Sequence, residues 1–119
     1  MTMTRKHFEE FAVSYGDSIA WTVNKYDTQS QRKDGKIYLE ALTDAITASI
    51  YIFRGFNSGF DSDRFNRRVL QVAINTMEKW QEMEDVEVHS KDNIHLWGLL
   101  QASKSLFEYD EPMDVIKSI

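Results

Sequence analysis

The fold is decided by residues 36–54, KIYLEALTDAITASIYIFR, a stretch without proline or glycine. Its apolar side chains recur at steps of three and four, the spacing of one face of an α-helix. They fall on two faces, the first with Tyr38, Ala41, Leu42, Ala45, Ser49, Ile52 and Phe53, and the second with Leu39, Ile46 and Ile50. A helix that is apolar on two faces is typical of a central position. We therefore expect a helical domain in which this segment has neighbours on both sides.

The segment before it predicts another helix, which begins after Thr4 as N-cap. Its apolar stripe consists of Phe8, Phe11, Ala12, Tyr15 and Ile19. Gly16 and Asp17 leave two alternatives open: the helix breaks there, or it continues to Tyr26. The polar residues 27–35, DTQSQRKDG, carry no stripe and predict a connection to the central helix.

The turn after the central helix reads GFNSGFDSDRF over residues 55–65. Gly55 is expected to end the helix in a left-handed conformation, and Asp61 to cap the next one. That third helix is predicted from Ser62 to Met83, with Phe65, Val69, Val72, Ala73, Met77 and Trp80 on its buried face. We expect Phe56, Phe60 and Phe65 to fix the corner to the core.

The remaining residues predict a short loop or extended segment at 84–88, a helix from Lys91 to Phe107 capped by Ser90, and a last turn from Pro112. The sequence therefore predicts an all-α fold, a compact bundle of four to five helices. At 119 residues, the chain is long enough for one hydrophobic core, so we expect a single domain over 1–119.

Composition narrows the classes of function. The chain has no cysteine, no apolar run long enough to span a membrane and no signal-like start, which favours a cytoplasmic location without membrane contact. The net charge is −5, and residues 78–119 hold ten acidic and only four basic side chains. This balance disfavours a classical duplex-DNA binder, which needs a basic face.

No pattern of catalytic residues stands out. The three histidines, His7, His89 and His95, form no HExxH arrangement, and no phosphate-binding glycine loop or nucleophile elbow is present. Too few candidate ligands come together for a metal site. We therefore expect a protein that is not an enzyme, with no catalytic residue, no metal and no cofactor.

Two segments resemble a known group of proteins. One is the start RKHFEEFA, residues 5–12, and the other is the pattern formed by Asn57, Phe60, Asp61, Arg64 and Phe65. Together they resemble small uncharacterised helical proteins of phages and prophages, over roughly residues 5–69. Those proteins usually have proline after the asparagine, where this chain has Ser58. The resemblance implies a mobile-element origin and a helical fold, and it implies no catalytic residue.

The charged and aromatic residues suggest where a partner could bind. The acidic candidates are Glu78, Glu82, Glu84, Asp85, Glu87 and Asp92, which form either a solvated surface or a contact for a basic partner. Trp21 lies beside the first stripe, where an exposed tryptophan would make an anchor. The basic candidates are Arg54, Arg64, Arg67 and Arg68, which either hold phosphates or pair with Asp61, Asp63 or the acidic end of the chain.

With the phage resemblance, these residues lead to a working hypothesis. The protein is expected to bind and inhibit a host protein or nucleoprotein complex in the bacterial cytoplasm, for example as an anti-CRISPR-like inhibitor of a defence system. Two alternatives stay open. One is a nucleic-acid-binding accessory factor that uses the arginines, and the other is a self-assembling module, such as a homodimer, that buries one face of the central helix.

Overall fold

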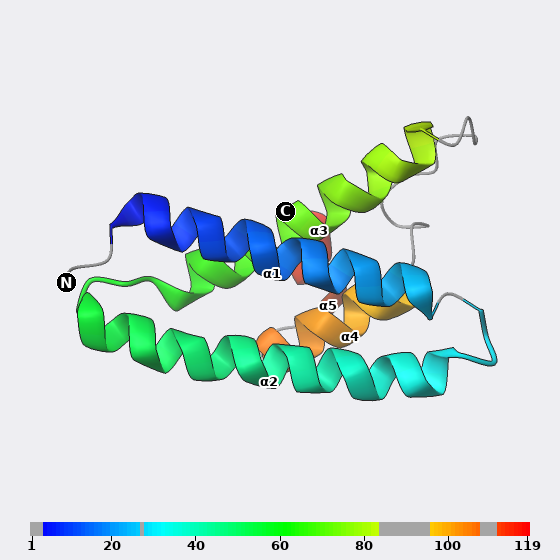
Figure 1. Ribbon diagram of the computed structural model, residues 1–119, viewed down its shortest axis with the longest axis horizontal. Coiled ribbons are helices and arrows are strands. Elements are labelled where there is room, and N and C mark those ends of the chain that lie inside the picture. Colours follow the sequence, from blue (N-terminus) through cyan, green and yellow to red (C-terminus); the bar gives the residue numbers. More distant parts are fainter. Residues whose placement is uncertain (1–3, 27, 84–95, 108–111) are drawn as a thin grey trace.

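The computed structural model describes residues 4–26, 28–83, 96–107 and 112–119, and within these ranges every element is a helix (Figure 1). The helices are α1 (Arg5–Lys25), α2 (Arg32–Phe56), α3 (Ser62–Met83), α4 (Leu96–Leu106) and α5 (Pro112–Ser118). The predicted all-α bundle of four to five helices is confirmed. The predicted segment at 84–88 and the start of the fourth helix at Ser90 and Lys91 lie outside the described residues.

The helices form an elongated bundle with a longest extent of 44 Å. In Figure 1, α1 and α2 run lengthwise in opposite directions, and α3 crosses behind α1. The most extensive contacts are those of α1 with α3 and of α2 with α4. Helix α5 packs on α4, and α2 forms one long edge of the bundle in this view.

Helix α1 continues through Gly16, which settles the alternative that the sequence left open. The residue is buried against α3: a Cβ atom there would lie 2.5 Å from the Cβ of Val72 and 2.7 Å from the carbonyl oxygen of Val69. On α4, a Cβ atom at Gly98 would overlap the side chain of Val23. The two glycines therefore let α1 approach α3 and α4 more closely than any side chain would allow.

All five helices contribute to one hydrophobic core. Its fully buried large apolar side chains are Ile19 and Val23 of α1, Leu39 and Ile46 of α2, Val69, Leu70 and Met77 of α3, Leu99 of α4 and Ile116 of α5. The short helix α5 therefore belongs to the same core as the long helices.

Helix α2 departs from its prediction in two ways. It begins at Arg32 rather than Lys36, so the connection before it is shorter than expected. The buried residues of α2 are those of the second predicted face, together with Gly35, Thr43 and Phe53. The first predicted face is mostly exposed, since α1 and α4 cover only one side of the helix. The expectation of neighbours on both sides is wrong for the described residues.

The end of α2 also differs from the prediction. Gly55 is helical, and the helix ends at Phe56, where the backbone N–H of Asn57 donates to the carbonyl of Phe53 at 2.9 Å. Asn57 leaves the helix in an extended conformation, and its Oδ1 accepts the N–H of Gly59 at 3.0 Å. Asparagine therefore makes this turn instead of a left-handed glycine. Phe56 is half exposed and does not reach the core, contrary to expectation.

We expect Gly16→Ala to destabilise the protein by about 1–2 kcal/mol. Overpacking against Val72 costs about 1–3 kcal/mol. Alanine favours the helix over glycine by up to about 1 kcal/mol, which offsets part of this cost. Urea unfolding followed by circular dichroism measures the difference. The matched control is Gly55→Ala, where a Cβ atom meets nothing within 4 Å. All variants are compared at one dilute protein concentration, so that contacts between copies do not contribute. A Gly16→Ala variant as stable as that control would contradict the close approach.

Candidate functional site

A cluster of aromatic rings lies where α1, α2 and α3 meet. Phe53 of α2 is at its centre, with ring centroids 5.3 Å from Phe8, 5.0 Å from Phe11, and 5.5 Å from both Phe60 and Phe65. Phe8 and Phe60 are 4.7 Å apart. Tilted and edge-on pairs at these distances stabilise one another beyond the area they bury. The cluster therefore fixes the start of α1, the turn after α2 and the start of α3 relative to one another.

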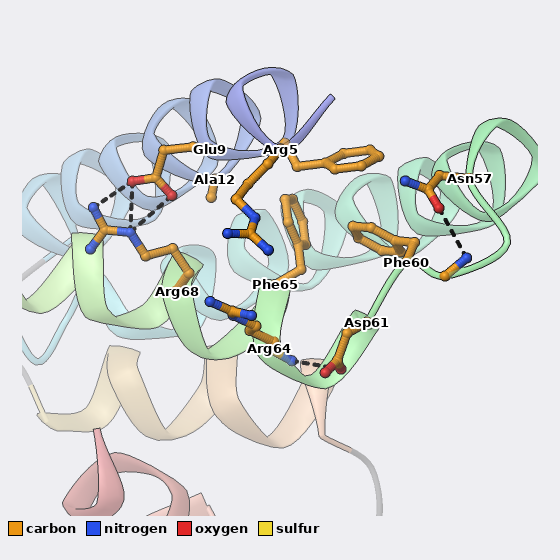
Figure 2. Close-up of a pocket in the computed structure, with 11 residues that line it drawn as sticks. Arg5, Glu9, Ala12, Asn57, Phe60, Asp61, Arg64, Phe65 and Arg68 are labelled. Atoms are coloured by element: carbon orange, nitrogen blue, oxygen red, sulfur yellow. Dashed lines mark hydrogen bonds and ion pairs between the residues drawn. The ribbon is translucent and has the colours of Figure 1, made fainter. Parts of the chain in front are cut away.

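A pocket of about 440 Å³ opens beside this cluster (Figure 2). Its lining comes from three segments: Arg5, Phe8, Glu9 and Ala12 of α1, Asn57, Gly59, Phe60 and Asp61 of the turn, and Arg64, Phe65 and Arg68 of α3. Except for Arg68, all of these residues lie within segments 5–12 and 57–65, which carry the predicted resemblance to phage proteins. Segments some 50 residues apart in the sequence thus form one site.

The wall formed by α3 is set by its N-cap. Oδ1 of Asp61 accepts the backbone N–H of Arg64 at 3.1 Å, as the sequence predicted. The carboxylate also lies at the positive end of the α3 dipole, which stabilises its charge. Because the cap begins the helix at Ser62, Arg64 and Arg68 follow one turn apart on the side that faces α1 (Figure 2).

Glu9 and Arg68 connect the two walls of the pocket. Nη2 of Arg68 lies 2.6 Å from Oε1 of Glu9, and Nε donates to Oε1 and Oε2 at 2.8 and 3.1 Å. The hydrogen bonds and the positive charge of Arg68 lower the pKa of Glu9, although partial burial opposes the shift. The same carboxylate raises the pKa of Arg68. Both side chains are more than a third exposed, so the pair contributes little to stability.

Arg5 and Arg64 give the pocket its excess of positive charge. Figure 2 shows Arg5 extending from α1 toward α3, on the same side of the pocket as Arg64 and Arg68. Among the described residues, neither the Arg5 nor the Arg64 guanidinium has an ionic or hydrogen-bonded partner. A guanidinium presents a planar set of N–H groups that matches a carboxylate or phosphate. The pocket can therefore receive an anionic group against an aromatic wall.

The lining combines guanidinium groups and carboxylates with aromatic rings. It contains no histidine, cysteine, serine or lysine, and its one carboxylate with a shifted pKa is shifted downward, which makes a weaker general base. Within the described residues, no group of three or more His, Asp or Glu side chains comes together to hold a metal ion. The arrangement offers positive charge and shape, and no nucleophile–base pair.

The four predicted basic residues do not form one patch. Arg64 and Arg68 line the pocket, whereas Arg67 pairs with Asp63 at 2.9 Å and donates to Ser118 of α5 at 2.6 Å. Arg54 donates to Ser62 at 2.6 Å and lies at a second hollow, between α2, α3 and α4. Asp63 was one of the partners that the sequence predicted for the arginines, and Arg67 pairs with it. Glu9, the observed partner of Arg68, was not among them.

The other predicted contacts lie toward the opposite end of α1 and α3. Trp21 is 63% exposed and packs edge-on against Trp80 of α3, with ring centroids 4.9 Å apart. Of the acidic candidates, Glu78 is half-buried on α3, and Glu82 lies in the last turn of that helix. Glu84, Asp85, Glu87 and Asp92 lie outside the described residues. The acidic contact therefore stays a prediction. Trp21 is exposed, which an anchor for a partner requires.

Comparison with known proteins assigns no relative: no family model matches the chain, and no match was found among curated proteins or solved structures. The resemblance to phage proteins accordingly stays a prediction. Within the described residues, no helix is both long and apolar enough to cross a membrane.

Sequence reasoning missed Arg5, Phe8 and Glu9 as members of a site. They could have been found if the two segments that carry the resemblance had been expected to lie side by side in the fold. Spacing along the chain could not show the Arg68–Glu9 pair, because the partners are 59 residues apart.

We expect Glu9→Gln to lower the free energy of unfolding at pH 7 by less than about 1 kcal/mol. Because the folded-state pKa of Glu9 is below its ordinary value of 4.5, the contribution is present above that pH and is lost as pH falls through the folded-state pKa. Urea unfolding from pH 7 downward measures it, with the exposed Glu10→Gln as control. A deficit that grows toward acid pH would contradict the pairing.

Proposed function

We propose that this protein is a non-enzymatic interaction protein, which binds a host protein or nucleoprotein complex and inhibits it. The observation that carries the proposal is the pocket in which the two resembling segments meet, with two guanidinium groups unpaired among the described residues. The pocket receives an anionic group of the partner, such as an acidic side chain or a terminal carboxylate.

The distribution of charge favours a protein partner over a nucleic acid. Nucleic-acid binders neutralise several phosphates along an extended basic track. Here Arg5 and Arg64 form one compact positive site on a chain of net charge −5, and Arg54 and Arg67 lie outside this pocket. One bidentate contact to a carboxylate fits such a site and gives specificity through its geometry.

A second contact is proposed at the other end of α1. Exposed Trp21 would anchor in the partner, and the acidic residues from Glu78 onward would approach a basic surface. Inhibition would then follow from occupancy: a bound bundle covers part of the partner's surface, with one copy needed for each site. The phage resemblance supports a bacterial host as the source of the partner, and a defence complex as its type.

The test uses the double variant Arg5→Glu/Arg64→Glu as bait in a host lysate, beside the wild type. The matched control, Lys36→Glu/Lys104→Glu, makes the same change in charge at exposed positions away from the pocket. We expect the wild type and the control to retain the same protein after nuclease treatment, and the pocket variant to lose it. Titration of that protein's activity should reach an end point at one copy per site.

Three outcomes would contradict the proposal. A pocket variant that retains the partner as well as the wild type would remove the pocket from the contact. Retention that disappears with nuclease would favour the nucleic-acid alternative. Activity of the partner that is unaffected by an excess of the protein would exclude inhibition.

A further inference from the structure

Within the part of the chain that the structure describes, the outer face of α2 is largely apolar and uncovered along its length. Ile37, Tyr38, Tyr51, Ile52 and Phe56 are each exposed by half or more, a concentration of large apolar side chains that no other helix shows among the described residues. Between them, alanines at positions 41, 45 and 48 are exposed near the middle of the face, and the exposed Asp44 lies at its margin, seven residues before Tyr51. In Figure 1 this helix lies along one edge of the bundle. A soluble chain rarely leaves such a face in water unless it binds something.

Gly55 leaves the backbone accessible on the same side of α2 as Ile37. It lies in the last turn of the helix, and a Cβ atom there would meet nothing within 4 Å. No contact among the described residues therefore requires a glycine here, and alanine would be the better helix former. A glycine on an exposed helix face allows another surface to approach the backbone closely.

An antiparallel pairing of this face with itself sets small residues opposite each other or opposite bulky ones. About a midpoint between Ile46 and Thr47, Ala45 lies opposite Ala48, Ala41 opposite Ile52, and Ile37 opposite Phe56. The same midpoint places Gly55 opposite Tyr38. Two copies of α2 packed antiparallel about a two-fold axis at this point would set small residues at the centre and bulky ones at both ends.

The charges beside the face are complementary in the same register. Glu40 and Arg54 are about four turns apart, so they lie on the same flank of α2. In the antiparallel pair, Glu40 of one copy lies within one residue of the level of Arg54 of the other, and the symmetry makes this contact twice. Arg54 uses one N–H group on Ser62, which leaves others of its five donors available.

The area is sufficient for a stable dimer. At roughly 200 Å² for an aromatic side chain, the exposed fractions of Tyr38, Tyr51 and Phe56 amount to about 350 Å². With the two isoleucines and the alanines, the face presents roughly 600 Å² per copy, or about 1,200 Å² for two. Stable interfaces begin at about this size.

From these observations we infer that the protein forms a symmetric homodimer through the outer face of α2, which packs antiparallel against α2 of a second copy. The contact is independent of the arginine pocket, which lies beside α1 and α3. A dimer would present two pockets related by the two-fold axis.

Sedimentation equilibrium over a range of concentrations tests the inference. We expect the wild type to approach the dimer mass, and Ala45→Glu, which buries an unpaired charge at the centre, to weaken association at least about tenfold. Ala45 is exposed, so circular dichroism should show the variant folded. A monomeric wild type, or an unaffected Ala45→Glu, would overturn the proposal.

The register has its own test. Glu40→Arg and Arg54→Glu should each weaken the dimer, and the double variant should restore it, because the exchanged charges face each other again. The exposed Glu10→Arg on α1 is the matched charge reversal and should leave association unchanged. A double variant as weak as the singles would refute the antiparallel pairing.

Discussion

The close approach of α1 and α3 at Gly16 is the contact on which the rest of the structure depends. With no side chain at this position, Val69 and Val72 of α3 lie directly against the backbone of α1. The N-terminal parts of the two helices are then near enough for Glu9 to reach Arg68. A wider separation would open the pocket and leave that carboxylate without its partner.

The pocket combines a rigid frame with local charge. The aromatic rings around Phe53 and the cap at Asp61 hold the three lining segments in place. The chain as a whole has a net charge of −5, whereas the guanidinium groups of Arg5 and Arg64 lie at the pocket without an ionic partner among the described residues. Such a site selects a partner by geometry at short distance, and one misplaced guanidinium would reduce its affinity.

The sequence predicts well what local interactions determine. The bounds of α3 and the cap at Asp61 follow from residues within one turn of each other, and both are observed as predicted. The choice between the two apolar faces of α2 could not be predicted, because it depends on where α1 and α4 pack. Likewise, Gly55 and Asn57 are both able to end a helix, and the side-chain hydrogen bond of Asn57 decides between them.

The candidate site was only partly predictable for the same reason. Arg64 and Arg68 stand out as a basic pair one turn apart, but their surroundings come from α1. The sequence placed Trp21 off the buried stripe, and it is exposed, because position along a helix fixes its direction. Which arginine pairs with which carboxylate depends on tertiary packing, and so the division of the predicted basic patch could not be foreseen.

The central claim, that Arg5 and Arg64 receive an anionic group of the partner, is tested most directly by NMR of their side-chain Nε–H signals. The retained partner is added to isotope-labelled protein, and Arg32, remote from the pocket, serves as internal reference. The account predicts that the Arg5 and Arg64 signals shift together on binding and that the Arg32 signal does not. Binding that leaves both pocket signals in place would contradict it.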